Sequence, residues 1–121
     1  MSSAVIAPKP HGGAVVISEN ITVECSDQQA ETIVYEWQIA IADAIESSGG
    51  LVGHIKALLF CEQQTIMISC VGDLPSISIS PASSQTDLIG RLSVTIIVFG
   101  ISKAAVKRYL GKLKNLLTGH K

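Results

Sequence analysis

Aromatic residues are scarce in this sequence and make up 4% of its 121 residues. One tryptophan, two tyrosines and two phenylalanines are too few for a surface that stacks on bases or sugar rings. Charged residues are also few, at 16%, whereas hydrophobic residues reach 47%. Disordered chains show the opposite balance, so we expect a folded domain with a substantial core.

Long apolar runs are lacking as well. The longest apolar stretch, from Leu92 to Ile101, is about half of the roughly 20 residues that a membrane helix requires, so we expect no membrane partner. The first residues, MSSAVIAPKPHGG, have no basic segment and contain two prolines, which is unlike a signal peptide. The three cysteines, Cys25, Cys61 and Cys70, form no CxxC pair. This pattern favours a reducing compartment, and we expect a cytoplasmic protein.

Motifs that identify enzyme classes are missing. The sequence contains no P-loop, no GxGxxG, no HExxH and no GxSxG, which excludes the common signatures of nucleotide binding, zinc proteolysis and serine hydrolysis. The cysteines lack the paired short spacings of zinc sites. We therefore expect neither a metal nor a cofactor, and the sequence leaves open whether the protein is an enzyme.

The chain length fits one domain. We expect residues 1–12 to be a flexible tail and residues 13–121 to be a single α+β domain. Residues 14–25 predict either a hairpin or one bent strand. The Ser-rich and Pro-rich segment 74–90 predicts a long exposed loop, in which residues 76–80 alternate and indicate a short edge strand.

Two segments predict helices. Ser26 and Gln29 have the spacing of a capping box, and apolar residues follow at helical spacing as far as Ile45, before Gly49-Gly50. Ser102 is the expected cap of a second helix that ends at about Leu117. Its apolar stripe consists of Val106, Leu110, Leu113 and Leu117.

Three further segments predict strands, at residues 51–61, 65–71 and 91–101. A turn at Gln63-Gln64 would place Ala57 opposite Cys70, Leu59 opposite Ile68 and Cys61 opposite Ile66. The element order β(β)-α-β-β-(β)-β-α predicts a two-layer α+β sandwich, with an antiparallel sheet of three to five strands and two helices on one face. The predicted core contains Ile33, Trp37, Ile41, Leu59, Ile68, Val94, Ile96 and Leu110.

A set of polar residues is the strongest candidate for chemistry. The expected register places His54 opposite Asp73 on the face without helices, with Lys56 beside them and Arg91 near the end of the pair. A histidine next to a carboxylate can act as a general base, and a cation can hold an anionic substrate. These four residues are the candidate catalytic residues of a small enzyme, and the alternative is a solvated sheet edge with ordinary ion pairs.

The same uncovered face also carries large apolar side chains. They are Leu58, Phe60, Met67, Val71, Ile97 and Phe99. Soluble monomers rarely expose such a surface, so we expect a homo-oligomer that packs sheet on sheet, with Phe60, Met67 and Phe99 in the interface. The N-terminal segment could cover this surface instead.

Charge is distributed unevenly although the net charge is only −1. Residues 1–62 contain eight acidic residues and two lysines, while five of the seven basic residues in 63–121 fall between Lys103 and Lys114. The favoured function is a small cytoplasmic homo-oligomer that binds a partner or an unknown small ligand. The first alternative is the small enzyme with His54, Lys56 and Asp73. The second is an RNA-binding module that uses the basic helix, although the low net charge makes nucleic acid the less favoured partner.

Overall fold

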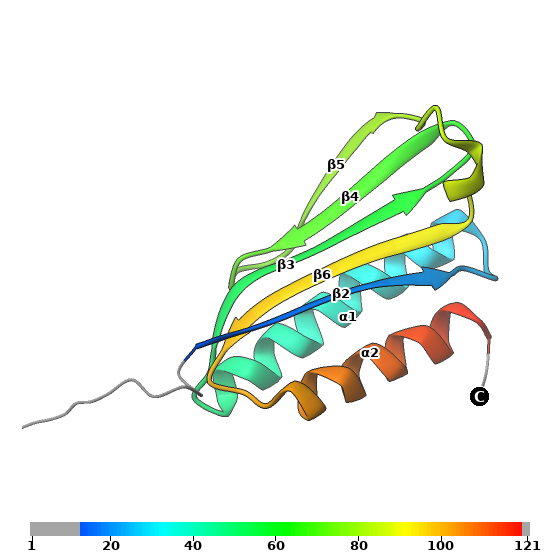
Figure 1. Ribbon diagram of the computed structural model, residues 1–121. Helices are drawn as coiled ribbons and strands as arrows, with labels where there is room; N and C mark the ends of the chain where they lie inside the picture. Colours follow the sequence, from blue (N-terminus) through cyan, green and yellow to red (C-terminus); the bar gives the residue numbers. More distant parts are fainter. Residues whose placement is uncertain (1–12, 120–121) are drawn as a thin grey trace, which may run out of the picture.

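One antiparallel sheet of five strands carries two helices on one face, as Figure 1 shows for the computed structural model. The structure describes residues 13–119, and the predicted tail 1–12 lies outside them. In chain order the elements are β2 (Ala14–Thr22), α1 (Asp27–Ser47), β3 (Leu51–Phe60), β4 (Gln64–Cys70), β5 (Ser76–Pro81), the 3-10 helix η2 (Thr86–Leu88), β6 (Arg91–Phe99) and α2 (Lys103–Leu117). The predicted two-layer α+β sandwich is confirmed.

The strand order is β2-β6-β3-β4-β5, and all four neighbouring pairs are antiparallel. Because β6 pairs with both β2 and β3, these two strands run parallel to each other with β6 between them. The connection through α1 is therefore a split β-α-β unit. Residues 14–22 form one edge strand, and residues 76–81 form the opposite edge.

The serines that the sequence indicated are the N-cap residues of both helices. The Ser26 Oγ accepts a hydrogen bond from the Gln29 backbone N–H at 3.1 Å, and the Gln29 Oε1 accepts one from the Ser26 N–H at 3.2 Å, which is a complete capping box. The Ser102 Oγ accepts from the Ala105 N–H at 3.1 Å. Within residues 13–119, none of the helices has the length and apolar character needed to span a membrane.

The core lies between the helices and the face of the sheet that they cover. Seven of the eight predicted core residues are buried. The exception is Ile33, which is partly buried against the core because it faces the gap between the two helices. Trp37 joins the helices directly, since its Nε1–H donates to the Tyr109 carbonyl at 2.8 Å.

The predicted register between β3 and β4 is wrong by two residues. Cys70 lies opposite Ile55, and Ile68 lies opposite Ala57. The turn is centred on residues 62–63, because the Cys61 N–H donates to the Gln64 carbonyl at 2.9 Å. A shift of two residues leaves every side chain on its predicted face, which is why the core prediction survives the error.

Candidate functional site

Both helices lie on one side of the sheet, and neither covers the opposite face (Figure 1). Its apolar side chains Leu58, Phe60, Met67, Ile97 and Phe99 are only partly buried. Val16 on β2 is 59% exposed. Val71, predicted to share this face, is exposed in the bend that follows β4. This open face is therefore accessible to a partner.

Strand pairing places a polar row across the middle of the open face. The row follows the cross-strand pairs from β2 to β5 and contains Ser18, Thr95, Lys56, Ser69 and Ser76. The hydroxyls of Ser18 and Thr95 lie 3.4 Å apart, as do those of Ser69 and Ser76. Lys56 is the charged residue of the row. It lies between these two hydroxyl pairs, on the middle strand of the sheet.

The polar row divides the apolar side chains into two clusters. The first cluster contains Leu58, Phe60 and Met67, of which Leu58 and Met67 are direct cross-strand partners. The second contains Val16, Ile97 and Phe99, in which Val16 faces Ile97 across the β2–β6 pair. The apolar surface is thus in two parts, whereas the sequence predicts a single surface.

A glycine bulge supports the second cluster. Gly53 is the extra residue where the β3–β6 register shifts between Val52 and His54. A Cβ atom at Gly53 would lie 2.9 Å from the Ile97 carbonyl oxygen and 3.1 Å from the Phe99 ring. The absence of a side chain at this position therefore allows the Phe99 ring to lie over the backbone.

Charges on the open face have one sign. Lys56 and Arg91 are its charged strand residues, together with the titratable His54. Glu19 is paired with the buried Val94 and so points to the helix side, where it borders a hollow with Lys103 and Lys107. Within the described strands, the open face carries basic groups and hydroxyls but no carboxylate.

The predicted set His54, Lys56, Asp73 and Arg91, which we call the polar corner, is not assembled. His54 and Lys56 lie two residues apart on the open face of β3, but Asp73 follows the end of β4 and borders a hollow with Asp43 and Glu46 of α1, on the helix side. The predicted pairing of His54 with Asp73 is wrong because it depended on the predicted β3–β4 register, which differs by two residues from the observed one. Arg91 is wrongly placed too, because β6 pairs with β3 and not with β4. His54 lies opposite Ile97, six residues from Arg91, or roughly 20 Å at the rise of a strand.

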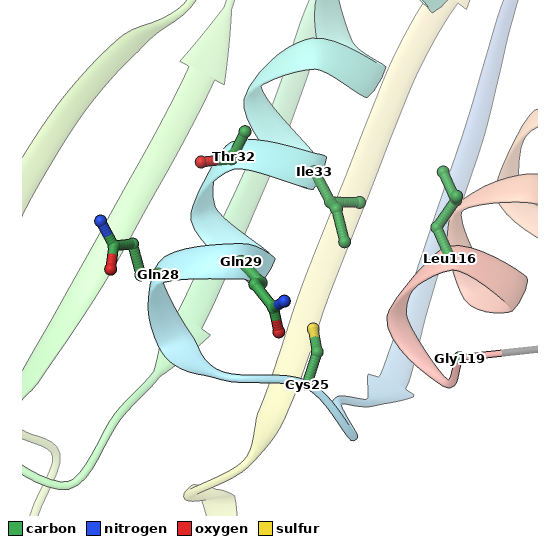
Figure 2. Close-up of a pocket in the computed structure, with 7 residues that line it drawn as sticks. All are labelled: Cys25, Gln28, Gln29, Thr32, Ile33, Leu116 and Gly119. Atoms are coloured by element: carbon green, nitrogen blue, oxygen red, sulfur yellow. The ribbon is translucent and has the colours of Figure 1, made fainter.

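A hollow of about 610 Å³ lies between the start of α1 and the end of α2. Figure 2 shows Cys25, Ile33 and Leu116 around the gap between the helices, while Gln28 and Thr32 point away from α2. The volume is in the range of small-ligand sites. Burial raises the pKa of the Cys25 thiol, so this thiol is poorly activated as a nucleophile. The lining of this hollow provides no pair of acid and base.

Cys61 and Cys70, like Cys25, lack the features of a reactive or metal-binding site. Cys25, Cys61 and Cys70 are all free thiols. Burial raises the pKa of Cys61 to about 11, and the nearby Asp27 carboxylate adds to this effect. Within residues 13–119, no group of three or more potential ligands could hold a metal ion.

The basic residues of α2 are exposed to solvent. They are Lys103, Lys107, Arg108, Lys112 and Lys114. The Lys112 Nζ lies 5.2 Å from the centre of the Tyr109 ring, a cation–π distance. Exposure is compatible with RNA binding and with a simple solvated helix face, so the RNA-binding alternative stays a prediction.

Comparison with known proteins identifies a shared fold. The sequence matches no protein-family model and no curated protein. Among solved structures, a zinc-bound YjiA GTPase from E. coli aligns with 83% of this chain, with a TM-score of 0.54 and 11% sequence identity. A zinc-bound triple mutant of the YjiA GTPase aligns with 84%, with a TM-score of 0.55 and 10% identity. This chain spans 29% and 30% of the length of those chains. At such low identity the likeness shows the fold alone.

Proposed function

We propose that this chain is a cytoplasmic protein-interaction domain that binds a second copy of itself through the open face of the sheet. The observation that carries the proposal is the set of large apolar side chains on a face that neither helix covers. Full burial of such a side chain contributes about 1.5–3 kcal/mol, and those on the open face are still partly exposed. Free cysteines support a reducing location.

The division of the open face favours a two-fold arrangement. β3 is the middle strand of the sheet, and Lys56 lies in the row between the two apolar clusters. A two-fold axis that passes through Lys56 diagonally to this row would place the cluster around Phe60 on the cluster around Phe99 of the second copy. The hydroxyls of the row can hydrogen-bond across the interface, in keeping with the self-complementary surfaces of two-fold dimers.

Light scattering coupled to size exclusion tests the proposal. At tens of micromolar, we expect a mass of about twice the 12.7 kDa of one chain. Phe60→Glu introduces a charge into the first cluster and should give a folded monomer. The matched control is Leu116→Glu, which changes a 53% exposed leucine on α2 and should leave the dimer intact. A wild-type monomer at these concentrations would disprove the proposed self-association.

A heterologous partner with an acidic surface is the second candidate, and the basic character of the open face supports it. Two-fold pairing brings two Lys56 side chains together, whereas an acidic partner would pair with them. Lys56→Met separates the candidates, because it should strengthen a homodimer and weaken binding to an acidic partner.

A further inference from the structure

The helix layer leaves one edge of the sheet uncovered on its own side. The substantial helix–sheet contacts are those of α1 with β3 and β4 and of α2 with β2, and Figure 1 shows β5 beyond α1 at the sheet edge. Ile77 and Ile79 of β5 are paired with the buried Ile68 and Ile66, so they point to the helix side. They nevertheless remain 43% and 60% exposed.

Two hollows lie along α1 beside this edge. One hollow of about 200 Å³ includes Tyr35 and Ile77, and a second of about 210 Å³ includes Ile39 and Leu74. The α1 residues of both hollows lie on one side of the helix, because they recur at intervals of three or four. These residues are Glu31, Thr32, Tyr35, Glu36, Ile39, Ala42, Asp43 and Glu46. We call these two hollows, together with the exposed Ile79 on the same side of β5, the α1–β5 groove.

The floor of the groove is apolar. Its members Ile39, Leu74, Ile77 and Ile79 are four of the eight large hydrophobic residues that are exposed in the described chain. Soluble proteins seldom gather exposed aliphatic side chains in one place without a binding role. The space beside α1, over β5, is also where a third helix would complete the helix layer of the sandwich.

The rim of the groove is acidic. Five carboxylates border the two hollows, and neither lining contains a lysine or an arginine. These residues are Glu31, Glu36, Asp43, Glu46 and Asp73. They amount to half of the ten acidic residues in the chain. An apolar floor between carboxylates fits an occupant with an apolar stripe and basic flanks.

We propose that the α1–β5 groove binds a basic amphipathic helix of a partner protein. From Glu31 to Glu46 the groove follows about 22 Å of α1, which matches a partner helix of about four turns. Leucine-like residues at helical spacing would fill the floor, and lysine or arginine residues beside them would meet the rim carboxylates. This site lies on the opposite side of the sheet from the proposed dimer surface and does not depend on it.

A labelled model peptide of about 16 residues tests the proposal by fluorescence anisotropy against the full chain. It carries leucines at i, i+3, i+4, i+7 and i+11 and lysines on both flanks, and a second peptide replaces each lysine with glutamate. We expect saturable binding of the lysine peptide alone. Binding should weaken several-fold between about 50 and about 300 mM salt, because salt screens the rim charges.

Two pairs of matched variants locate the binding. Ile79→Asp should raise the Kd by about ten-fold or more, whereas Leu116→Asp, which changes an exposed leucine of α2 (53% against 60% exposed), should leave it within about two-fold. Glu36→Lys with Glu46→Lys should also raise the Kd by about ten-fold. Its control is Glu62→Lys with Asp87→Lys, two exposed acids outside the groove. Circular dichroism confirms that each variant is folded.

Two results of the peptide titration overturn the proposal. One is the absence of saturable binding of the lysine peptide, and the other is binding that Ile79→Asp does not change. If Ile79→Asp converts a wild-type oligomer into a monomer while Phe60→Glu does not, the groove holds a second copy of this chain and the proposed partner is wrong. If Phe60→Glu alone gives the monomer, the open-face dimer and the groove are separate, and the peptide titration decides the groove by itself.

Discussion

The two faces of the sheet are formed by the same strands but have different physical roles. On β3, Leu59 points to the helices and is 1% exposed, while its neighbour Leu58 points to the open face and is only partly buried. The part of the sheet that lies under the helices is aliphatic and buried, whereas the open face alternates apolar clusters with hydroxyls and a central lysine. The covered part supplies most of the stability of the fold, and the open face contributes less to it.

The largest effect that tests this comparison is the loss of a leucine from each face. Leu59→Ala should lower the free energy of unfolding by about 2–5 kcal/mol, because it leaves a cavity between α1 and the sheet. Leu58→Ala should lower it by less than about 1 kcal/mol in dilute solution, where the open face is unpaired. Urea denaturation at low protein concentration measures both. Equal losses in the free energy of unfolding of the two variants would show that another part of the same chain covers the open face.

The next effect concerns two glycines with different surroundings. Gly53→Ala should cost about 1–3 kcal/mol, because the new Cβ would lie 2.9 Å from the Ile97 carbonyl oxygen. Gly111, on the exposed side of α2, has open space at the Cβ position, so Gly111→Ala should stabilise the protein by about 0.5–1 kcal/mol. Thermal denaturation of the two variants checks the signs. If Gly53→Ala were neutral, the bulge and the Phe99 ring over it would be adaptable.

A smaller effect is expected at the end of the helix face, at alkaline pH. Burial raises the pKa of Cys61 from 9.0 to about 11, so the unfolded chain loses this proton at a lower pH than the folded one. The stabilisation is complete below about pH 9 and is lost as the pH rises towards 11. The free energy of unfolding should therefore fall more steeply over this interval in the wild type than in Cys61→Ala. Parallel slopes would contradict the raised pKa.

The faces of the strands were predictable, whereas the positions along them were not. Strand periodicity assigns Leu59 and Ile68 to the core whatever the turn. The turn itself lies in the segment Glu62–Gln63–Gln64, which lacks the glycine, asparagine or proline that would fix its centre. The two-residue error that resulted was harmless for the core. It was decisive for the polar corner, because that hypothesis required His54 and Asp73 to be directly opposite each other.

Strand order was beyond the reach of the sequence because it depends on distant pairs. Ala14 lies opposite Phe99, and no local pattern indicates that β6 enters between β2 and β3. The α1–β5 groove was missed for the same reason. The acidic residues of α1 were visible as a charged segment, but only the sheet order brings Ile77 and Ile79 beside them.

A further small effect concerns Gln38, a polar residue on the helix side of the core that was not among the predicted core residues. Gln38 is fully buried. Its Nε2 donates to the Ile68 carbonyl at 2.8 Å, but its Oε1 has no hydrogen-bond partner within the described chain. An unpaired buried acceptor costs about 1–3 kcal/mol, while the bond that is made contributes about 0.5–1.5 kcal/mol.

Gln38→Met keeps a similar shape and should therefore raise the free energy of unfolding by about 1 kcal/mol in urea denaturation. Gln38→Ala should destabilise the protein, because it removes the buried volume as well. A loss of stability in Gln38→Met would mean that the hydrogen bond to Ile68 outweighs the unpaired oxygen, and that this face tolerates a polar group because the bond positions α1 on β4.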